Sequence, residues 1–390
     1  MITLKDERIM KQPIWEMHGG KGKVCILTSV HPPFDPRIFH KEAQTLVQAG
    51  YEVVLIAPYD KGSERVDGVH IIGLPRYKRR FYRPLNWWRI LRTALGQKAD
   101  VYHFHDPELL PVGILLKLTT RACVVYDVHE NYPWQIGARE WLPRPLRGIT
   151  SWGIRLLEAM AATLVNGVVA ATEHIAARFP TAKTRVVKNY PLLAMMALSP
   201  DDQRTYEGNY TLIYTGGLTN HRGIYQIVQA LAYVKTPQAR LTLLGRKIHH
   251  STAKAVREMP GFKRVDYHGH VSHKIVFRYL NSAAVGLVCN QPQYDYDLAQ
   301  PTKLFEYMCA GLPVIASNFD LWKDIVEGNE CGVTVDPTDP QQIAGAIDYL
   351  LGHPEIRRTM GQNARRAIRE KYNWERESRK LLSLYREVLH

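Results

Sequence analysis

Short, continuous apolar runs alternate with helical stretches along this chain, and that alternation limits its fold more than any other feature. Val24–Val30 (VCILTSV) is the first run and Val53–Ala57 (VVLIA) is the second, and a helix is predicted between them from about Pro36 to Ala49. Unbroken runs of this length are typical of strands that are buried on both faces. Such strands, separated by helices, predict a parallel sheet covered by helices on both sides.

The alternation is interrupted once and then restarts, which predicts two α/β domains in one chain. The interruption is polar and lacks a clear period, and the new series begins with the strand Thr211–Tyr214. We expect a polar tail at residues 1–22, a first doubly wound domain at 23–195 and a linker at 196–209. A second such domain at 210–370 and a last amphipathic helix at 371–390 would follow. Ligands of such sheets bind at the carboxyl ends of the strands. Two domains that face each other would place the site in the cleft between them.

Composition and charge narrow the classes of partner. The 390 residues carry a net charge of +14, which favours nucleic acid, phosphorylated small molecules or an anionic membrane surface. Five scattered cysteines argue against a disulfide framework and favour a reducing compartment. The N-terminus has no apolar region typical of a signal peptide, and no stretch suits a membrane span, so a cytoplasmic protein is expected.

The stretch Gln300–Ser317 (QPTKLFEYMCAGLPVIAS) predicts a helix whose N-terminus faces an anionic ligand. Pro301 and Thr302 suit the first turn, where free N–H groups favour a phosphate. Lys303 would add a mobile cation, and Glu306 could accept hydrogen bonds from two vicinal hydroxyls, as in a ribose. The alternative is that Lys303 and Glu306 form a solvated pair on the helix surface.

A second loop, Tyr214–Gly223 (YTGGLTNHRG), also has the residues of a phosphate site. Gly216 and Gly217 would let the backbone approach a ligand closely. Arg222, at the start of the next helix, could clamp a phosphate. The alternative is an ordinary strand-to-helix turn with a surface arginine.

Taken together, these stretches resemble the family 4 glycosyltransferases of the GT-B fold. The matching segments are LIYTGGLTNHRGIYQIVQAL, PTKLFEYMCAGLPVIAS, CGVTVDPTD and YNWERESRKLLSLYREVL in the second half, and SVHPPFDPRIFHKEAQTLVQAGYEVVLIAP, VYHFHDPELLPVG and YDVHENYP in the first. The resemblance covers nearly the whole chain from about Lys23. It implies two Rossmann-like domains, a last helix that crosses back to the first domain, and a nucleotide-sugar donor held mainly by the second. It also implies retention of anomeric configuration, and no metal or other cofactor.

The resemblance assigns roles to single residues. Arg222 matches a basic residue that binds the donor diphosphate in the family. Glu306 matches the second glutamate of an E-x7-E motif, which contacts the ribose. His129 matches a histidine that lies beside the donor sugar. The loop His31–Arg37 matches a glycine-rich loop of the family. The expected donor site consists of Gly216, Gly217, Arg222, Arg246, Pro301, Thr302, Lys303 and Glu306, with His129, Arg222, Lys303 and Glu306 as its catalytic members.

The chain departs from the family pattern at two positions. Leu298 stands where the motif has its first glutamate, and the candidates to replace it are Asp295, Asp297 and Gln300. Gly217 stands where a basic residue often follows the strand, and Lys303 or Arg246 could supply that charge.

Polar residues at strand ends in the first half are further candidates. His129 and Glu130 follow the strand Cys123–Val128, where a histidine could donate a hydrogen bond to the sugar or the leaving diphosphate. His105 and Asp106 end another strand, and together with Glu130 they are candidates for acceptor contacts, although a structural histidine fits His105 equally well. The remaining histidines lack carboxylates or cysteines at ligand spacing, so no metal site is predicted at His249, His250, His268, His270 and His273.

The segment Arg76–Lys98 (RYKRRFYRPLNWWRILRTALGQK) is basic and aromatic and has no acidic residue. It predicts an amphipathic segment on anionic lipid, and the same character recurs at Trp134, Trp141, Arg144, Arg147, Trp152 and Arg155. The alternatives are a nucleic-acid patch or a basic helix packed on the core by its tryptophans. No nucleic-acid motif supports the first of these, so nucleic acid is not expected as a partner.

The sequence therefore predicts a retaining glycosyltransferase, peripheral on the inner face of the membrane. It would move a sugar from a nucleotide diphosphate to a hydroxyl of a saccharide or lipid-linked acceptor, in surface polysaccharide or glycolipid assembly. The alternatives are a catalytically weak nucleotide-sugar-binding or scaffold protein, which Leu298 favours, and an epimerase or hydrolase of the same fold. The nucleotide, the sugar, the acceptor and the oligomeric state stay open.

Overall fold

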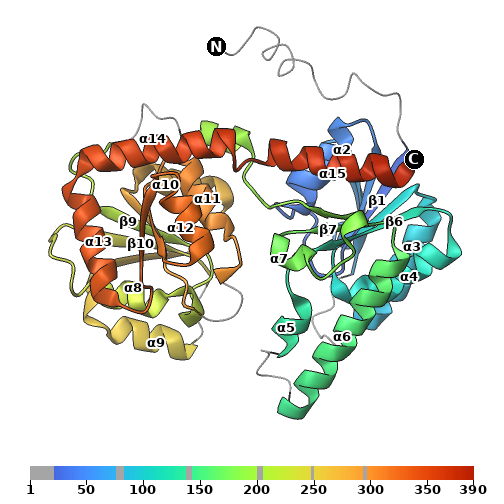
Figure 1. Cartoon of the computed structure of the whole chain (residues 1–390), viewed down its shortest axis with the longest axis horizontal. Coiled ribbons are helices and arrows are strands. Elements are labelled where there is room, and N and C mark those ends of the chain that lie inside the picture. Colours follow the sequence, from blue (N-terminus) through green and yellow to red (C-terminus); the bar gives the residue numbers. More distant parts are fainter. Residues whose placement is uncertain (1–21, 76–82, 138–142, 200–204, 247–249, 293–296) are drawn as a thin grey trace, which may run out of the picture. The chain divides into compact units, whose positions relative to one another are not determined.

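The computed structural model describes residues 22–75, 83–137, 143–199, 205–246, 250–292 and 297–390. The chain forms two compact units (Figure 1): the first ends at Asn189 and also includes Glu377–His390, and the second is Tyr190–Arg376. The division precedes the segment 196–209 for which a linker is predicted, because Tyr190 and Met196 pack in the core of the second unit. The predicted fold class, two α/β domains with parallel sheets, is confirmed.

The first unit is built on an eight-stranded sheet with the order β3-β4-β2-β1-β5-β6-β7-β8. Its strands are β1 (Lys23–Leu27), β2 (Glu52–Pro58), β3 (Ser63–Val66), β4 (Val69–Leu74), β5 (Val101–Phe104), β6 (Cys123–Val128), β7 (Gly167–Ala170) and β8 (Thr184–Val186). The edge strand β3 pairs antiparallel with β4, and all other pairs are parallel. The sequence did not predict β3, because its residues (SERV) are polar and partly exposed and so form no apolar run.

Helices cover both faces of this sheet. On one face, α3 (Arg83–Gln97), α4 (Leu110–Thr119) and α6 (Arg144–Leu164) share a single core with the strands. On the other lie a π-helical turn, α2 and α15, at Ile38–Ala43, Gln44–Gln48 and Trp374–Leu389. The remaining helical segments are Pro107–Leu109, α5 (Tyr132–Gly137), α7 (Glu173–Ala176) and Thr181–Lys183. Side chains alternate along a strand, so Phe104 faces the α3–α4–α6 layer whereas His103 faces the opposite layer.

The second unit is built on a six-stranded parallel sheet with the order β11-β10-β9-β12-β13-β14. Its strands are β9 (Thr211–Thr215), β10 (Arg240–Leu244), β11 (Val265–Gly269), β12 (Val285–Val288), β13 (Val314–Ser317) and β14 (Gly332–Val335). Its α-helices are α8 (Ile224–Ala230), α9 (His250–Glu258), α10 (His273–Ser282), α11 (Thr302–Cys309), α12 (Asp320–Val326), α13 (Pro340–Gly352) and α14 (Pro354–Glu370), and 3-10 turns lie at Leu193–Leu198, Asn220–Arg222 and Pro260–Arg264. One core cluster contains residues of α10, α11, α12 and α14, and another contains residues of α8 and α13.

The order of the strands reverses at one place in each sheet. In the first unit the reversal lies between β1 and β5, and in the second it lies between β9 and β12. Loops diverge there at the carboxyl ends of the strands, which is where ligands bind in sheets of this kind.

The last helix belongs to the first unit, as predicted from the family resemblance. Glu377–His390 is part of that unit. Leu381, Leu384 and Tyr385 are buried there. None of the described helices combines the length and the apolar character that a membrane span requires.

Candidate active site

The loop after β9 is shaped by its glycines. Gly216 has a φ of 114°, a conformation that residues with a side chain rarely adopt. A Cβ at Gly245, in the loop after β10, would lie 1.9 Å from the carbonyl oxygen of Gly216, so the two loops need glycine to approach each other. The hydroxyl of Tyr307 accepts a hydrogen bond of 2.8 Å from the Thr215 amide and fastens the end of β9 to α11. The loop is thereby held beside the start of α11.

Arg222 reaches back to the same loop. It ends a 3-10 turn and is followed by Gly223, whose φ is 78°. A Cβ at Gly223 would lie 1.8 Å from the carbonyl oxygen of Cys289, so only glycine fits here. A Cβ at Gly217 would lie 3.1 Å from Nη1 of Arg222, which shows that the guanidinium lies against the loop backbone. The structure therefore brings together the three residues of the predicted GG…R motif.

Lys303 is buried next to this loop. Its side chain lies over the ring of Tyr214, with Nζ 3.7 Å from the ring centroid. Nζ is also 3.3 Å from the position of a Cβ at Gly216. Among the residues that the structure describes, no acceptor makes a hydrogen bond to this ammonium group. Burial, and then the nearby Arg222, lowers the pKa of Lys303 well below its ordinary value. An anion between the two cations would remove this penalty.

The start of α11 and Glu306 complete the group. Pro301 is extended and precedes the first helical residue, Thr302, and no described side chain caps this end. The first N–H groups of α11 are therefore available to an anion. Glu306 is half-buried, and its Oε1 lies 3.2 Å from Nε2 of His273 at the start of α10. His273 was not predicted to contact Glu306, and no sequence signal marks the approach of α10 to α11.

The candidates to replace the missing glutamate take different places. Leu298 and Asp297 are exposed in the loop before α11, whereas Asp295 lies outside the described residues. Gln300 accepts a hydrogen bond from the Tyr190 hydroxyl, so its side chain is engaged within the unit. Arg246 is exposed in the loop after β10. In the part of the chain that the structure describes, no interaction links Arg246 to Lys303 or Arg222.

At the strand-order reversal of the first unit, Asp106 holds the neighbouring loop. Its Oδ2 accepts hydrogen bonds from the Thr28 hydroxyl and the Ser29 amide, at 2.8 and 2.6 Å. Asp106 is buried, and so is His105 beside it. The structure thus engages Asp106 inside the protein and buries His105, whereas Glu130, the third proposed acceptor residue, is exposed.

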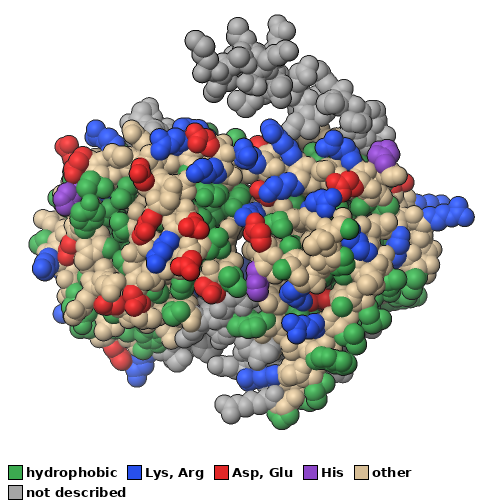
Figure 2. Space-filling model, in the orientation of Figure 1, with side chains coloured by type: hydrophobic (Ala, Val, Ile, Leu, Met, Phe, Trp, Pro, Cys, Tyr) green, Lys and Arg blue, Asp and Glu red, His purple; other side chains and the backbone are tan. Residues whose placement is uncertain are grey.

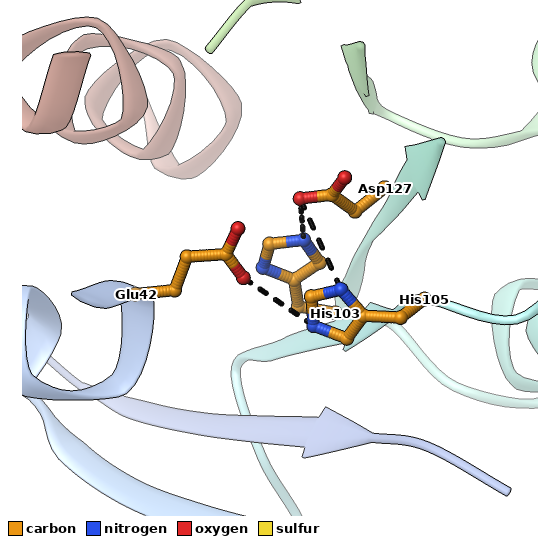
Figure 3. A group of neighbouring side chains, drawn as sticks. All are labelled: Glu42, His103, His105 and Asp127. Atoms are coloured by element: carbon orange, nitrogen blue, oxygen red, sulfur yellow. Dashed lines mark ion pairs between the residues drawn. The ribbon is translucent and has the colours of Figure 1, made fainter. Parts of the chain in front are cut away.

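Behind this edge lies a buried cluster of charged side chains, drawn in Figure 3. Its four members come from three places in the chain and point toward one another: Glu42, His103, His105 and Asp127. Nε2 of His105 lies 3.5 Å from Oε2 of Glu42, and Nε2 of His103 lies 3.5 Å from Oδ2 of Asp127. On its other side, His103 is fixed by the hydroxyl of Tyr385, which lies 2.8 Å from Nδ1.

Arg37 places a positive charge against both carboxylates of this cluster. Its Nη2 lies 3.1 Å from Oδ2 of Asp127, and its Nε lies 2.7 Å from Oε1 of Glu42. Four ligand atoms within 4.8 Å of one another would suit a metal ion. The guanidinium already supplies a cation to both carboxylates, so the residues present form a self-neutralising network and do not fit an open metal site.

The pKa shifts agree with this distribution of charge. Burial opposes the charged form of Asp127, but Arg37 and His129 outweigh it and hold the pKa of Asp127 well below its ordinary value. Burial and the neighbouring Asp127 raise the pKa of Glu42. Burial and His103 lower the pKa of His105. These shifts favour the charged forms of Asp127 and Arg37 and oppose the charged forms of Glu42 and His105.

His129 lies between this network and the surface. Its Nε2 is 3.1 Å from Oδ1 of Asp127 and 3.0 Å from Nδ1 of His105. The side chain is partly exposed, with a neighbouring histidine ring, His31, at a centroid distance of 5.8 Å. Glu130 follows it and is exposed. Asp127 thus fixes one ring nitrogen of His129 and leaves the other ring edge toward the surface.

Sequence reasoning missed the residues that orient His129. Arg37, Glu42, His103 and Asp127 stand at separate points of the chain and form no motif. Only the alternation of side chains along β5 and β6, once the pairing of these strands is known, puts His105 beside Asp127.

Both halves of the chain match glycosyltransferase families. Residues 197–367 match the model described as "Glycosyl transferases group 1", and residues 37–189 match "Glycosyltransferase Family 4". A relative named as an uncharacterized glycosyltransferase, from Methanocaldococcus jannaschii, is 22% identical over 371 residues, which cover 88% of this chain and 92% of the relative.

Solved structures show the same fold. A sucrose-phosphate synthase from Thermosynechococcus elongatus is 20% identical with a TM-score of 0.77, over 94% of this chain and 99% of that one. The HepE protein of Anabaena, solved in complex with UDP-glucose, is 14% identical with a TM-score of 0.71, over 94% of this chain and 100% of that one. Because the two family models together match most of the chain, it belongs to the group 1 glycosyltransferases of family 4, and the predicted enzyme class and GT-B fold are confirmed.

Proposed function

We propose that the enzyme transfers a sugar, with retention of configuration, from a nucleoside diphosphate to a hydroxyl group. The observation that carries the proposal is the buried ammonium of Lys303 beside Arg222, with no described hydrogen-bond acceptor. A diphosphate placed there would contact two cations and the free N–H groups of α11. The HepE structure, which holds UDP-glucose in the same fold, supports a donor of this class.

The same residues give the chemistry a physical basis. Negative charge grows on the diphosphate as the glycosidic bond breaks, and preorganised donors in a water-poor site stabilise it. Lys303, Arg222 and the loop at Gly216 supply such donors without a metal ion. Glu306 would accept hydrogen bonds from the ribose, displacing His273. His129, oriented by Asp127, would donate a hydrogen bond to the sugar or to the leaving diphosphate.

The acceptor class is inferred from the charge of the protein. A net charge of +14 favours an acidic surface, which agrees with a lipid-linked or saccharide acceptor at the inner face of a membrane. The pathway would then be the assembly of a surface polysaccharide or glycolipid.

The test is a panel of UDP-, GDP-, ADP- and dTDP-sugars, scored by the thermal midpoint of the purified enzyme. We expect one nucleotide class to raise the midpoint by about 3 °C or more, and Lys303→Ala to abolish the rise. Lys254→Ala, which removes an exposed lysine of the same unit, is the matched control and should respond like the wild type. No rise with any donor would overturn the proposal.

A second candidate is a protein that binds a nucleotide sugar without transferring it. Leu298 favours this candidate, because it is exposed in the loop before α11 and cannot accept a hydrogen bond from a sugar. A midpoint rise without any transfer or release of sugar would support it. Release of free sugar or of an epimer would instead indicate a hydrolase or an epimerase.

A further inference from the structure

Helix α6 presents large apolar side chains to solvent along one side. They recur every three or four residues and are 38% to 67% exposed: Leu146, Ile149, Trp152, Leu156, Met160 and Leu164. This spacing keeps them on a single stripe of the helix, called here the α6 stripe. The opposite side of the helix packs into the core through Ala161, Ala162 and Leu157. The helix is therefore apolar on two sides, and the core needs only one of them.

The neighbouring helices extend this apolar surface. α4 packs against α6, and α3 packs against α4, over the same face of the sheet. Leu118 on α4 and Trp88 on α3 are 66% and 67% exposed. A monomeric protein rarely exposes a large apolar area that serves no interaction. The outer side of this helical layer is therefore a candidate binding surface.

The charge of this layer selects the partner. The three helices contain one acidic residue, Glu158, which is buried and bound to Tyr126 and Arg178. The basic residues on and beside these helices include Arg92, Lys117, Arg121, Arg147 and Arg155. Figure 2 shows green apolar and blue basic side chains mixed along α6 at the lower right. The layer combines apolar and positively charged groups, as interfacial helices do.

We propose that α6 docks the enzyme on an anionic lipid surface. The α6 stripe would enter the boundary between headgroups and acyl chains, with Trp152 in the interfacial zone that tryptophan prefers. Arg155 and the basic residues of α3 and α4 would face lipid phosphates. A second copy of the chain fits less well, because a symmetric contact would bring two basic surfaces together. A nucleic acid would leave the apolar stripe in water.

The docking element is not Arg76–Lys98, the main segment for which the sequence predicts lipid contact, but α6, of which the sequence analysis named Trp152 and Arg155. Residues 76–82 lie outside the described residues. From Arg83 the segment forms α3, which packs Trp87, Ile90 and Leu91 on the core. The predicted alternative, a helix held on the core by its tryptophans, therefore applies to Trp87, whereas Trp88 is 67% exposed and Leu95 is 38% exposed. The longer stripe is on α6.

The test is flotation of the full chain with vesicles of phosphatidylcholine containing about 30% phosphatidylglycerol. We expect the triple variant Ile149→Gln/Trp152→Gln/Leu156→Gln to lower vesicle affinity by about tenfold or more. Arg155→Gln should weaken binding to these vesicles but not the weak binding to pure phosphatidylcholine. The matched control is Tyr233→Gln/Tyr349→Gln, which alters two apolar side chains of similar exposure in the second unit and should bind like the wild type.

Each variant must keep the thermal midpoint of the wild type, which is expected because all the substituted side chains point outward. The proposal is overturned if the wild type ignores anionic vesicles or if the triple variant binds them equally well. It is also overturned if the wild type is a dimer that the triple variant converts to a monomer, since a second copy would then cover the stripe. Vesicle binding does not require sugar transfer, so this proposal and the proposed function can fail separately.

Discussion

At the scale of single residues, the site depends on charges that the fold keeps short of partners. Lys303 is 7% exposed and lies over a tyrosine ring, where water cannot solvate its ammonium group well. The carboxylate of Glu306 lies 3.2 Å from the exposed side chain of His273. Poorly solvated charged groups destabilise the protein when no ligand is bound. A ligand that pairs with them removes this cost on binding. Affinity for the donor should therefore depend strongly on these two residues.

The first prediction concerns Glu306 and the ribose. The wild type should bind the preferred nucleoside diphosphate about tenfold more tightly than its 2′-deoxy analogue, because a hydrogen bond to a charged group contributes about 1.5 kcal/mol. Glu306→Gln should largely lose this preference, as measured by titration calorimetry. His273→Ala is the matched control and should keep it, since the carboxylate remains. If Glu306→Gln discriminates as well as the wild type, Glu306 does not contact the ribose.

The second prediction concerns the protonation of Glu42. The pKa of Glu42 is raised in the folded chain, so its contribution to stability is present below the ordinary glutamate pKa and is lost as pH rises. Glu42→Gln mimics the neutral form and avoids this loss. The midpoint of the variant, relative to the wild type, should therefore rise between pH 5 and pH 8 by about 2 °C or more.

Glu52→Gln, an exposed substitution in the same unit, serves as the control for this pH series. A variant that loses more stability at pH 8 than at pH 5 would contradict the expectation. That outcome would mean that an ionised Glu42 holds Arg37 in the folded protein.

At the scale of elements, the strand-to-helix connections of the second unit set the geometry. The loops after β9 and β10 touch through Gly216 and Gly245, and the turn before α8 touches Cys289 at the end of β12 through Gly223. In each contact, a backbone carbonyl oxygen occupies the space that the Cβ of any other residue would need. The glycines therefore fix how far Arg222 stands from the loop it faces.

The third prediction compares two glycines of this unit. Gly223→Ala should destabilise the second unit by about 3 kcal/mol, because it combines a left-handed backbone with a clash against a carbonyl oxygen. Gly345→Ala is the control, since it lies in α13 with open space around its Cβ position, and it should stabilise by about 0.5 kcal/mol. Denaturant unfolding of both variants measures the difference. Equal effects would contradict the close approach at Gly223.

The same scale shows what sequence can predict. The helix Thr302–Cys309 was predicted and is observed, because its start at Pro301 and its end at Ala310–Gly311 are local signals. The cluster around Asp127 was not predicted, since its members meet only through strand register and helix packing. Of the α6 stripe only Trp152 was named from the sequence, because apolar residues on both sides of a helix do not tell which side the core covers.

At the scale of the whole molecule, the chain returns to its first unit at the end. The last helix covers the sheet face that carries the charged cluster, and Tyr385 contacts His103 within it. The first unit is therefore complete only after the second has been synthesised. The contact between Tyr385 and the cluster joins residues that lie 282 positions apart in the sequence.

The fourth prediction is that removal of residues 377–390 unfolds the first unit. Leu381, Leu384 and Tyr385 are fully buried, and each such loss costs about 3 kcal/mol, which together approaches the stability of a typical domain. Calorimetry should show the loss of one transition, while nucleotide still stabilises the second unit. Tyr385→Phe, the milder control, should cost only about 1 kcal/mol. A truncated chain with both transitions intact would contradict the prediction.

The most direct test of the central claim is transfer of labelled sugar from the donor found in the panel to a membrane lipid extract. We expect the wild type to incorporate label, Lys254→Ala to match it, and Lys303→Ala to be slower by about a hundredfold, because it loses a cation on the leaving diphosphate. Full incorporation by Lys303→Ala would contradict the assigned site. Tight donor binding by the wild type with no incorporation would contradict the proposed transfer and leave a nucleotide-sugar-binding protein.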